Sequence, residues 1–362
     1  MKNTLGTNVS VTVFGESHGK AIGAVIDGLP AGITVDEAFI SHQLDLRRPF
    51  GKISTPRQEA DNFQIMSGVF NNKTTGTPIC IVIPNENTRS KDYNYGVARP
   101  GHADFTAFSK YNGNEDYRGG GHFSGRITAG LVSVGAIAID LLRKKGITLG
   151  THIKKCAGVE DADFTDYITE TECLNKKIFA TLDDSKGEEM IKNIEKAAAE
   201  NNSVGGILET VVTGLPVGVG EPWFDSVESV LSHALFSVPA VKGVEFGCGF
   251  SCADMLGSEM NDELYFDNGT VKTKTNNNGG INGGITNGMP VTFRCAIKPT
   301  PSISKEQDTI NFITNENVKS STHGRHDPCI VHRARVVVDS VTAIVLCDLL
   351  SQKFGTDWLG KK

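Results

Sequence analysis

The chain has 362 residues, of which 39% are hydrophobic and 22% charged, a composition typical of folded globular proteins and not of disordered ones. Its 36 basic and 42 acidic side chains give a net charge of −6. This charge disfavours nucleic acid as a partner, because proteins that bind the phosphate backbone carry a basic balance or stripe. The 40 glycines exceed the average share of about 7% and indicate tight turns or loops pressed against a ligand.

The sequence also predicts the cellular compartment of the protein. Residues 1–15 (MKNTLGTNVSVTVFG) lack the unbroken apolar stretch of a signal peptide. No apolar run reaches the roughly 18 residues that cross a bilayer, and the longest, residues 129–142, contains Asp140. Eight cysteines without a C-x-x-C pair fit reduced thiols, and Cys248 with Cys252 lacks the second pair that a zinc site needs. We therefore expect a cytoplasmic protein without membrane association.

Apolar periodicity predicts a mixture of strands and helices along the chain. We expect strands at 9–14, 21–27 and 78–84, helices at 36–47, 126–145, 186–202, 225–236 and 339–354, and an Asn/Gly-rich loop at 268–288. The fold class is therefore α+β. Residues 25–32 (VIDGLPAG) and 211–218 (VVTGLPVG) resemble each other, which suggests either an internally duplicated unit or two independent strand-to-turn signals.

Four segments carry most of the arginines and histidines. They are residues 15–19 (GESHG), 47–57 (RRPFGKISTPR), 99–126 (RPGHADF to GGGHFSGR) and 323–335 (HGRHDPCIVHRAR). They hold nine of the twelve arginines, six of the nine histidines and two of the 24 lysines. Guanidinium groups bind carboxylates and phosphates in a bidentate manner and stay charged when desolvated, so this preference predicts a polyanionic ligand. The histidines add groups that transfer protons near neutral pH.

Three glycines at 119–121 precede the helix expected at 126–145. Consecutive backbone N–H groups and the positive end of the helix dipole would meet there and hold a phosphate. The segment has neither the Gly-Lys-Ser/Thr of a Walker loop nor the spacing of a dinucleotide fingerprint. We therefore expect an anion site of another kind.

Two other interpretations stay open. Four side chains of the last segment could bind a metal ion, as in a metal-dependent phosphohydrolase: His323, His326, Asp327 and His332. The three arginines in the same segment would repel a bound cation but suit an anion. The other alternative is a non-enzymatic anion sensor or RNA-binding protein, which the net charge of −6 disfavours.

Six motifs occur in the order and spacing of the chorismate synthase family. They are GESHG (15–19), RRP with TPR (47–57), RPGHAD (99–104), DYRGGG (116–121), KPT (298–300) and GRHDPC (324–329). The resemblance spans nearly the whole chain. It implies one domain over residues 1–362, with a β-α-β sandwich built by duplication, assembled as a homotetramer.

The resemblance also implies an activity. Members of that family convert 5-enolpyruvylshikimate 3-phosphate to chorismate and phosphate by a 1,4-anti elimination, the last step of the shikimate pathway to aromatic amino acids. The reaction requires reduced FMN although no net oxidation occurs. The substrate carries two carboxylates and a phosphate, which fits the preference for arginine. Members that reduce their own flavin with NADPH tend to be longer, so an external flavin reductase is implied, with NADPH as an indirect reductant.

Residue roles follow from the same resemblance, motif by motif. The implied catalytic residues are His18 beside the reduced flavin, His102 as the acid for the leaving phosphate, and Asp327 assisting flavin N5 as base. The implied substrate ligands are Arg48, Arg118 and Arg126. Positions associated with NADP are Arg47 and Lys52. The implied FMN contacts are His122, Phe123, Ser124, Gly283, Lys298, Pro299, Thr300, Pro301, Ser302 and Arg325. No metal site is implied.

The chain departs from the family pattern at three places. His122 and Phe123 stand where many relatives have Arg and Ser or Ala, and Ile127 follows Arg126 where they have Glu. The loop after Arg48 is one residue shorter than in many relatives, which affects the match at Lys52. None of these departures touches the three implied catalytic residues.

Overall fold

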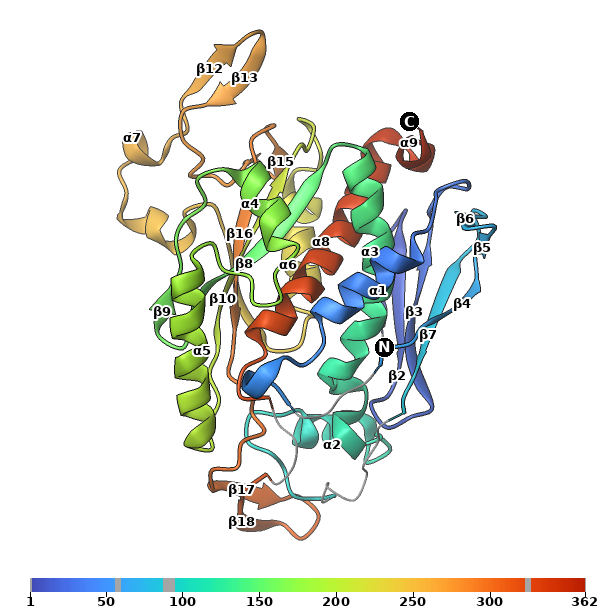
Figure 1. Cartoon of the computed structure of the whole chain (residues 1–362), viewed down its shortest axis with the longest axis vertical. Coiled ribbons are helices and arrows are strands. Elements are labelled where there is room, and N and C mark those ends of the chain that lie inside the picture. The colour runs from blue at the N-terminus through green and yellow to red at the C-terminus, as the bar shows by residue number, and fades with distance from the viewer. Residues whose placement is uncertain (1, 56–59, 87–94, 323–326, 362) are drawn as a thin grey trace.

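Two five-stranded antiparallel sheets flank a central pair of long helices, α3 (Thr128–Lys144) and α8 (Val331–Phe354), in the computed structural model of the chain (Figure 1). The structure describes residues 2–55, 60–86, 95–322 and 327–361. The helix α3 packs on α8 and on β3, whereas α8 packs on β8. Mixed helices and strands in this layered arrangement confirm the expected α+β sandwich.

The elements have the following bounds. The first sheet contains, in spatial order, β1 (Thr4–Leu5), β2 (Ser10–Gly15), β3 (Ala21–Asp27), β7 (Ile79–Pro84) and β4 (Gln64–Ser67). The second contains β11 (Val241–Phe246), β16 (Val291–Ile297), β10 (Gly206–Thr213), β8 (Thr148–Cys156) and β9 (Val159–Glu160). The small hairpins are β5 (Val69–Phe70) with β6 (Lys73–Thr74), β12 (Leu264–Asp267) with β13 (Thr270–Thr273), β14 (Ile281–Asn282) with β15 (Ile285–Thr286), and β17 (Gln307–Asn311) with β18 (Glu316–Ser320).

The remaining helices lie around this core. They are α1 (Glu37–Leu46), α2 (Asp104–Tyr111), α4 (Tyr167–Leu174), α5 (Asp184–Ala199), α6 (Val227–Leu235), α7 (Gly257–Met260) and α9 (Thr356–Gly360). Short 3-10 turns are η1 (Gly51–Ile53), η3 (Arg118–Phe123), η4 (Gly125–Ile127), η5 (Trp223–Asp225) and η6 (Gly249–Asp254). The predicted strands 9–14, 21–27 and 78–84 and the predicted helices 36–47, 126–145, 186–202 and 225–236 are confirmed within a few residues.

Local chemistry explains the best-predicted helix boundaries. The side chain of Asp36 accepts a hydrogen bond from the backbone N–H of Phe39, which caps the start of α1. In α3, glycine permits close packing on both sides. A Cβ at Gly130 would lie 2.7 Å from the backbone of Gly23 in β3, and one at Gly135 would lie 2.3 Å from the Cβ of Ser340 in α8. These two contacts bring the first sheet and α8 against opposite faces of α3.

Three predictions were wrong in part. The helix α8 begins at Val331, eight residues before the predicted start at 339. The prediction missed this start because α8 is buried on every side and so lacks an amphipathic pattern. The predicted loop 268–288 contains β13 to β15. The three glycines do not run directly into α3, since Ser124 and the 3-10 turn η4 intervene before Thr128.

The two halves of the chain repeat one architecture. In chain order β2, β3, α1, β4, β7 and α3 correspond to β8, β10, α6, β11, β16 and α8, and the paired strands occupy matching places in the two sheets. Both GLP-x-G turns are held by one threonine in the same way, each distance being 2.6–3.0 Å. The bonds are Gly32 N to Thr74 O, Ile33 N to Thr74 Oγ1 and Thr74 Oγ1 to Pro30 O, matched by Gly218 N to Thr286 O, Val219 N to Thr286 Oγ1 and Thr286 Oγ1 to Pro216 O. The structure therefore supports the duplicated unit over two independent signals.

One helical segment, Gly125–Lys144, is long and apolar enough to cross a membrane. Buried residues make up 83% of its most apolar window, which is the burial expected of a core helix. All eight cysteines are free, and the Sγ atoms of Cys156 and Cys329 lie 3.6 Å apart in the core.

A buried histidine in strand β8 of the second sheet gives a prediction about stability. His152 has no exposed surface, and its Nδ1 and Nε2 lie 2.8 Å from Asp161 and 2.9 Å from Glu209. Burial lowers the pKa of His152, but the bonds to Asp161 and Glu209 outweigh it, so the pKa is raised above its usual value. The charged form therefore stabilises the fold below the unfolded pKa of about 6.5, and this contribution is lost as pH rises through the folded pKa.

We expect His152→Gln to cost about 3 kcal/mol of unfolding free energy at pH 6, since it removes one partner of a buried ionic group. The cost should shrink as pH rises. Urea unfolding of both proteins between pH 5.5 and 9 measures this difference, and an equal cost at all pH values would contradict the charged assignment.

Candidate active site

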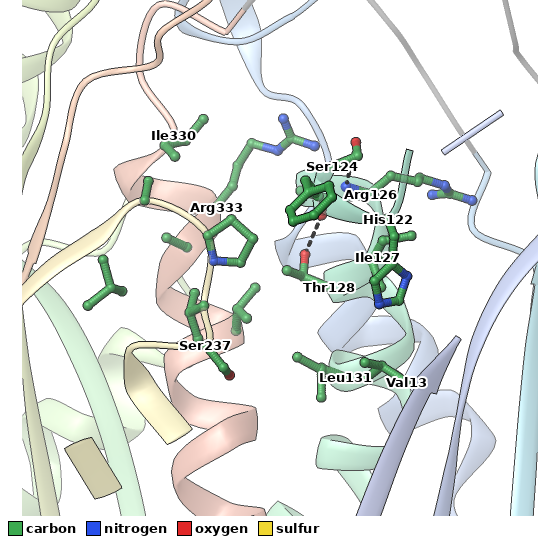
Figure 2. Close-up of a pocket in the computed structure, with 18 of the residues that line it drawn as sticks. Val13, His122, Ser124, Arg126, Ile127, Thr128, Leu131, Ser237, Ile330 and Arg333 are labelled. Carbon is green, nitrogen blue, oxygen red and sulfur yellow. Dashed lines mark hydrogen bonds between the residues drawn. The ribbon is translucent and has the colours of Figure 1, made fainter. Parts of the chain in front are cut away.

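A cavity of about 810 Å³ lies between α3 and α8 (Figure 2). From the α8 side, Ile330 and Arg333 face residues at the start of α3, among them Ser124 and Thr128. Among the described residues, the wall contains two acidic side chains, Asp61 and Asp327, and seven basic ones: Lys2, Arg47, Arg99, Arg126, Lys242, Lys298 and Arg333. Apolar side chains complete it: Val11, Val13, Ile127, Leu131, Val238, Val337, Val341 and Ile344. This excess of cations, in a chain of net charge −6, suits an anionic ligand.

The triple-glycine segment packs directly against two of the predicted catalytic histidines. Gly119 and Gly120 have φ values of +62° and +80°. A Cβ at Gly119 would lie 2.1 Å from Nδ1 of His18, and one at Gly120 would lie 3.0 Å from Cε1 of His102. The backbone N–H of Ser17 also donates to the carbonyl of Gly121. Glycine is therefore required here for close approach, and the segment joins GESHG to RPGHAD.

His102 is oriented by the residues that flank it in its own motif. Its Nδ1 lies 2.8 Å from Oδ1 of Asp104 and 3.0 Å from Nη2 of Arg99. Arg99 in turn donates from Nε and Nη2 to both oxygens of Asp104, at 2.8 and 2.7 Å. Burial raises the pKa of Asp104, but the bonds from Arg99 and His102 outweigh it and hold that pKa well below its usual range. The ionised carboxylate thus fixes the imidazole, as in other carboxylate–histidine pairs.

A second acidic residue joins two buried arginines. Asp61 accepts from Nη1 of Arg126 and from Nη1 of Arg47, the latter at 3.4 Å. Arg47 also donates to Thr128 Oγ1 at 3.0 Å and to the carbonyl of Gly125 at 2.7 Å. Burial lowers the pKa of Arg47 to about 9, although the carboxylate of Asp61 opposes this effect. Arg47 therefore stays charged at neutral pH, inside the cavity wall.

Asp327 is held by groups from two other segments. Its Oδ1 accepts from the backbone N–H of Thr55 at 2.8 Å, and its Oδ2 accepts from Nη1 of Arg333 at 2.7 Å. The loop after β16 completes the wall, where Lys298 Nζ donates to the carbonyl of Gly101 at 2.5 Å and Ser302 Oγ accepts from Arg99 at 3.3 Å. The cavity therefore joins the KPT motif to RPGHAD.

Comparison with known proteins identifies the family of the chain. Residues 9–351 match the family model described as chorismate synthase. The chain belongs to the chorismate synthase family. Proteins named chorismate synthase from Dehalococcoides mccartyi and Methanocaldococcus jannaschii are 46% and 47% identical to it; 96% and 97% of this chain and 96% of each relative are covered. A solved structure titled as a crystal structure of chorismate synthase has a TM-score of 0.77 and 30% identity, over 97% of this chain and 94% of that one.

Chorismate synthases are carbon–oxygen lyases of the shikimate pathway, so the comparisons confirm the family, the enzyme class and the fold expected from the motifs. They leave the individual residues untested. Of the residues predicted from the family, eleven line the cavity: Arg47, His102, His122, Phe123, Ser124, Arg126, Lys298, Thr300, Pro301, Ser302 and Asp327. His122 donates from Nδ1 to the carbonyl of Gly15 at 2.7 Å.

Other predicted residues lie elsewhere. His18 is buried behind Gly119. Arg48 pairs with Asp45 at 2.7 Å and Arg118 with Asp116 at 2.8 Å, both with 43% of the side chain exposed. Three more residues are exposed and outside the cavity wall: Lys52, Gly283 and Pro299. Arg325 lies outside the described residues. The two residues predicted for NADP differ in their surroundings, since Arg47 is buried and Lys52 is exposed.

Sequence reasoning missed several residues of the cavity wall. Arg99 and Arg333 lie in segments chosen for their arginines but were given no role, and residues 237–242 carried no signal that marked them. Asp61 was also missed, because an isolated aspartate near a glutamate reads as solvated surface.

The described residues do not support the metal-binding interpretation. Among them, no group of three or more histidine, cysteine, aspartate or glutamate side chains could hold a metal ion. His323 and His326 lie outside the described residues. His332 is buried in α8 with Nε2 2.8 Å from Ser54 Oγ, and Asp327 is paired with Arg333.

Proposed function

We propose that this chain converts 5-enolpyruvylshikimate 3-phosphate to chorismate and phosphate by 1,4-anti elimination in the cavity between α3 and α8. The observation that carries the proposal is a histidine held by a carboxylate, His102 on Asp104, in a wall with seven basic side chains. Phosphate leaves with the electron pair of its carbon–oxygen bond, and a ring hydrogen leaves as a proton. A cationic site with an oriented imidazole suits the first of these events.

The cavity also suits reduced FMN, the cofactor implied by the family. Its volume of about 810 Å³ lies within the range that holds small-molecule ligands. Apolar side chains such as Leu131 and Val341 can contact a flavin ring, while Lys298 supplies a cation for its phosphate or for the substrate. We propose that Ser124, Lys298, Thr300 and Ser302 hold the cofactor. When bound, reduced FMN supplies electron density that assists departure of the phosphate.

Four residues of the chain have separate roles in the proposed reaction. Arg126 binds a substrate anion from the cavity wall, where Asp61 and Asn85 fix its guanidinium. His102 donates a proton to the departing phosphate through Nε2, because Nδ1 is held by Asp104. Asp327, which belongs to the GRHDPC motif, helps remove the proton from the substrate ring. His18, kept behind Gly119, orients or protonates the cofactor.

We also propose that residues 1–362 form one domain that assembles as a homotetramer. Four large apolar side chains are 76–90% exposed on the second half: Trp223, Phe224, Phe250 and Phe266. They lie in η5, η6 and the hairpin β12–β13. Exposed apolar surface is typical of association sites, and subunit contacts would bury these side chains.

The proposed setting is the cytoplasm, where an external flavin reductase supplies reduced FMN and NADPH acts only through that reductase. Arg47 is buried and Lys52 is exposed, so these two residues do not present their cations together on one exposed surface, which supports indirect use of NADPH.

An anaerobic assay tests the activity. The purified protein is mixed with the substrate and chemically reduced FMN, and chorismate and phosphate are measured, with oxidised FMN and with NADPH plus oxidised FMN as controls. We expect both products in equal amounts with reduced FMN alone. Phosphate without chorismate would favour a phosphohydrolase, and chorismate with NADPH and oxidised FMN would place a reductase in this chain.

A further inference from the structure

Arg333 joins three segments of the cavity wall that are distant in the sequence. It lies in the first turn of α8. Its Nε donates to the carbonyl of Arg47, the C-terminal cap of α1, at 2.8 Å. Its Nη1 donates to Oδ2 of Asp327 at 2.7 Å. One planar guanidinium therefore fixes the end of α1 and Asp327 relative to α8.

The surroundings make this arrangement rigid. The side chains of Arg333 and Asp327 are each 16% exposed. The other oxygen of Asp327 accepts from the N–H of Thr55 at 2.8 Å, so both of its oxygens are bonded in defined directions. In Figure 2 the side chain of Arg333 extends from α8 toward Ser124 on the opposite wall. Among the described residues, the bond from the N–H of Thr55 is the contact that would still hold the carboxylate without Arg333, and a single bond at one oxygen lets the carboxylate rotate.

We propose that Arg333 is a positioning residue, which acts by holding the carboxylate of Asp327 against the cavity where the substrate's ring hydrogen is removed. The inference rests on the proposed function, because Asp327 has its role only in that reaction. A lysine cannot replace Arg333 fully. Its single ammonium group lacks the planar fork that reaches Arg47 and Asp327 at once.

Three variants test the proposal: Arg333→Gln, Asp327→Asn and the double variant. We expect Arg333→Gln to lower kcat by about 10- to 100-fold, the loss typical when a group that orients an active ligand is removed, with KM for substrate changed less than about threefold. Because Arg333 acts through Asp327, the double variant should match Asp327→Asn within about threefold. Arg333→Lys should recover part of the loss.

Binding measurements separate positioning from other roles. Calorimetric titration with 5-enolpyruvylshikimate 3-phosphate and fluorescence titration with oxidised FMN should give dissociation constants close to those of the original protein. Arg143→Gln is the matched control, since Arg143 is an exposed arginine of α3 stacked on Phe39. It should keep kcat, and thermal unfolding of each variant checks that the fold is retained.

Other outcomes would overturn the inference. Effects of Arg333→Gln and Asp327→Asn that multiply in the double variant would mean that Arg333 acts independently of Asp327. A raised KM and weaker substrate binding with unchanged kcat would make Arg333 a direct ligand of the substrate. Should Arg333→Gln fail to fold, Arg333→Lys combined with Asp327→Asn gives the same comparison. Failure of the unaltered protein to form chorismate would instead contradict the proposed function.

Discussion

His102→Asn should lower kcat by about 10²- to 10⁴-fold, the contribution usual for a positioned acid or base. Asparagine is close to histidine in reach but cannot donate a proton to the leaving phosphate. The geometry favours a catalytic role because Nδ1 donates to the carboxylate of Asp104, which Arg99 in turn holds, and this leaves Nε2 as the nitrogen available to the substrate. The low pKa of Asp104, caused by its bonds from Arg99 and His102 against the effect of burial, keeps this arrangement intact in mildly acidic solution.

The measurement is single-turnover formation of chorismate under anaerobic conditions, with substrate affinity determined separately by calorimetry. The matched control is His42→Asn, because His42 is exposed in α1, outside the cavity wall, with its Nε2 3.4 Å from the carbonyl oxygen of Asn175. It should retain kcat. Undiminished turnover of His102→Asn would remove His102 from the mechanism.

Gly119→Ala should reduce activity by about 10²-fold or more, the effect expected when a catalytic group is displaced by about 1 Å. The added Cβ would lie 2.1 Å from Nδ1 of His18 and 2.8 Å from Oγ of Ser17, so the histidine or the loop must move. The φ of +62° adds a further cost, because a left-handed conformation of a non-glycine residue costs about 1–2 kcal/mol.

Gly158→Ala separates these two effects. Gly158 has a φ of +83°, but nothing lies within 4 Å of a Cβ placed there, and it sits in the turn between β8 and β9. It should therefore share the backbone cost and keep full turnover. Thermal unfolding and kcat measured on both variants distinguish strain from displacement. Equal activity of the two variants would show that the packing of Gly119 on His18 has no catalytic consequence.

Much of the fold was accessible from the sequence because local patterns determined it. Asp36 marks the start of α1 by capping it, and the alternation or apolar run at β2, β3 and β7 follows from one buried face. The repeated GLP-x-G turn pointed to the duplication, but only the structure showed that Thr74 and Thr286 hold the two turns with the same bonds.

The start of α8 escaped prediction for a physical reason. Arg333 and Arg335 were assigned to an anion-binding segment and not to a helix, yet α8 is enclosed between the layers and Arg335 is 1% exposed. A helix buried on all sides has no polar face, so periodicity cannot reveal it.

The sequence by itself determined the family, the ionic character of the ligand and the motifs that meet in the cavity, since these depend on residue type and order. Only the tertiary structure decided which members of those motifs face the cavity. It placed Arg48 and Lys52 outside, made Asp61 the partner of Arg47 and Arg126, and joined Arg333 to Asp327. The physical reason is that burial and ion pairing arise between segments distant in the chain, and no local pattern records which side chains will neutralise one another.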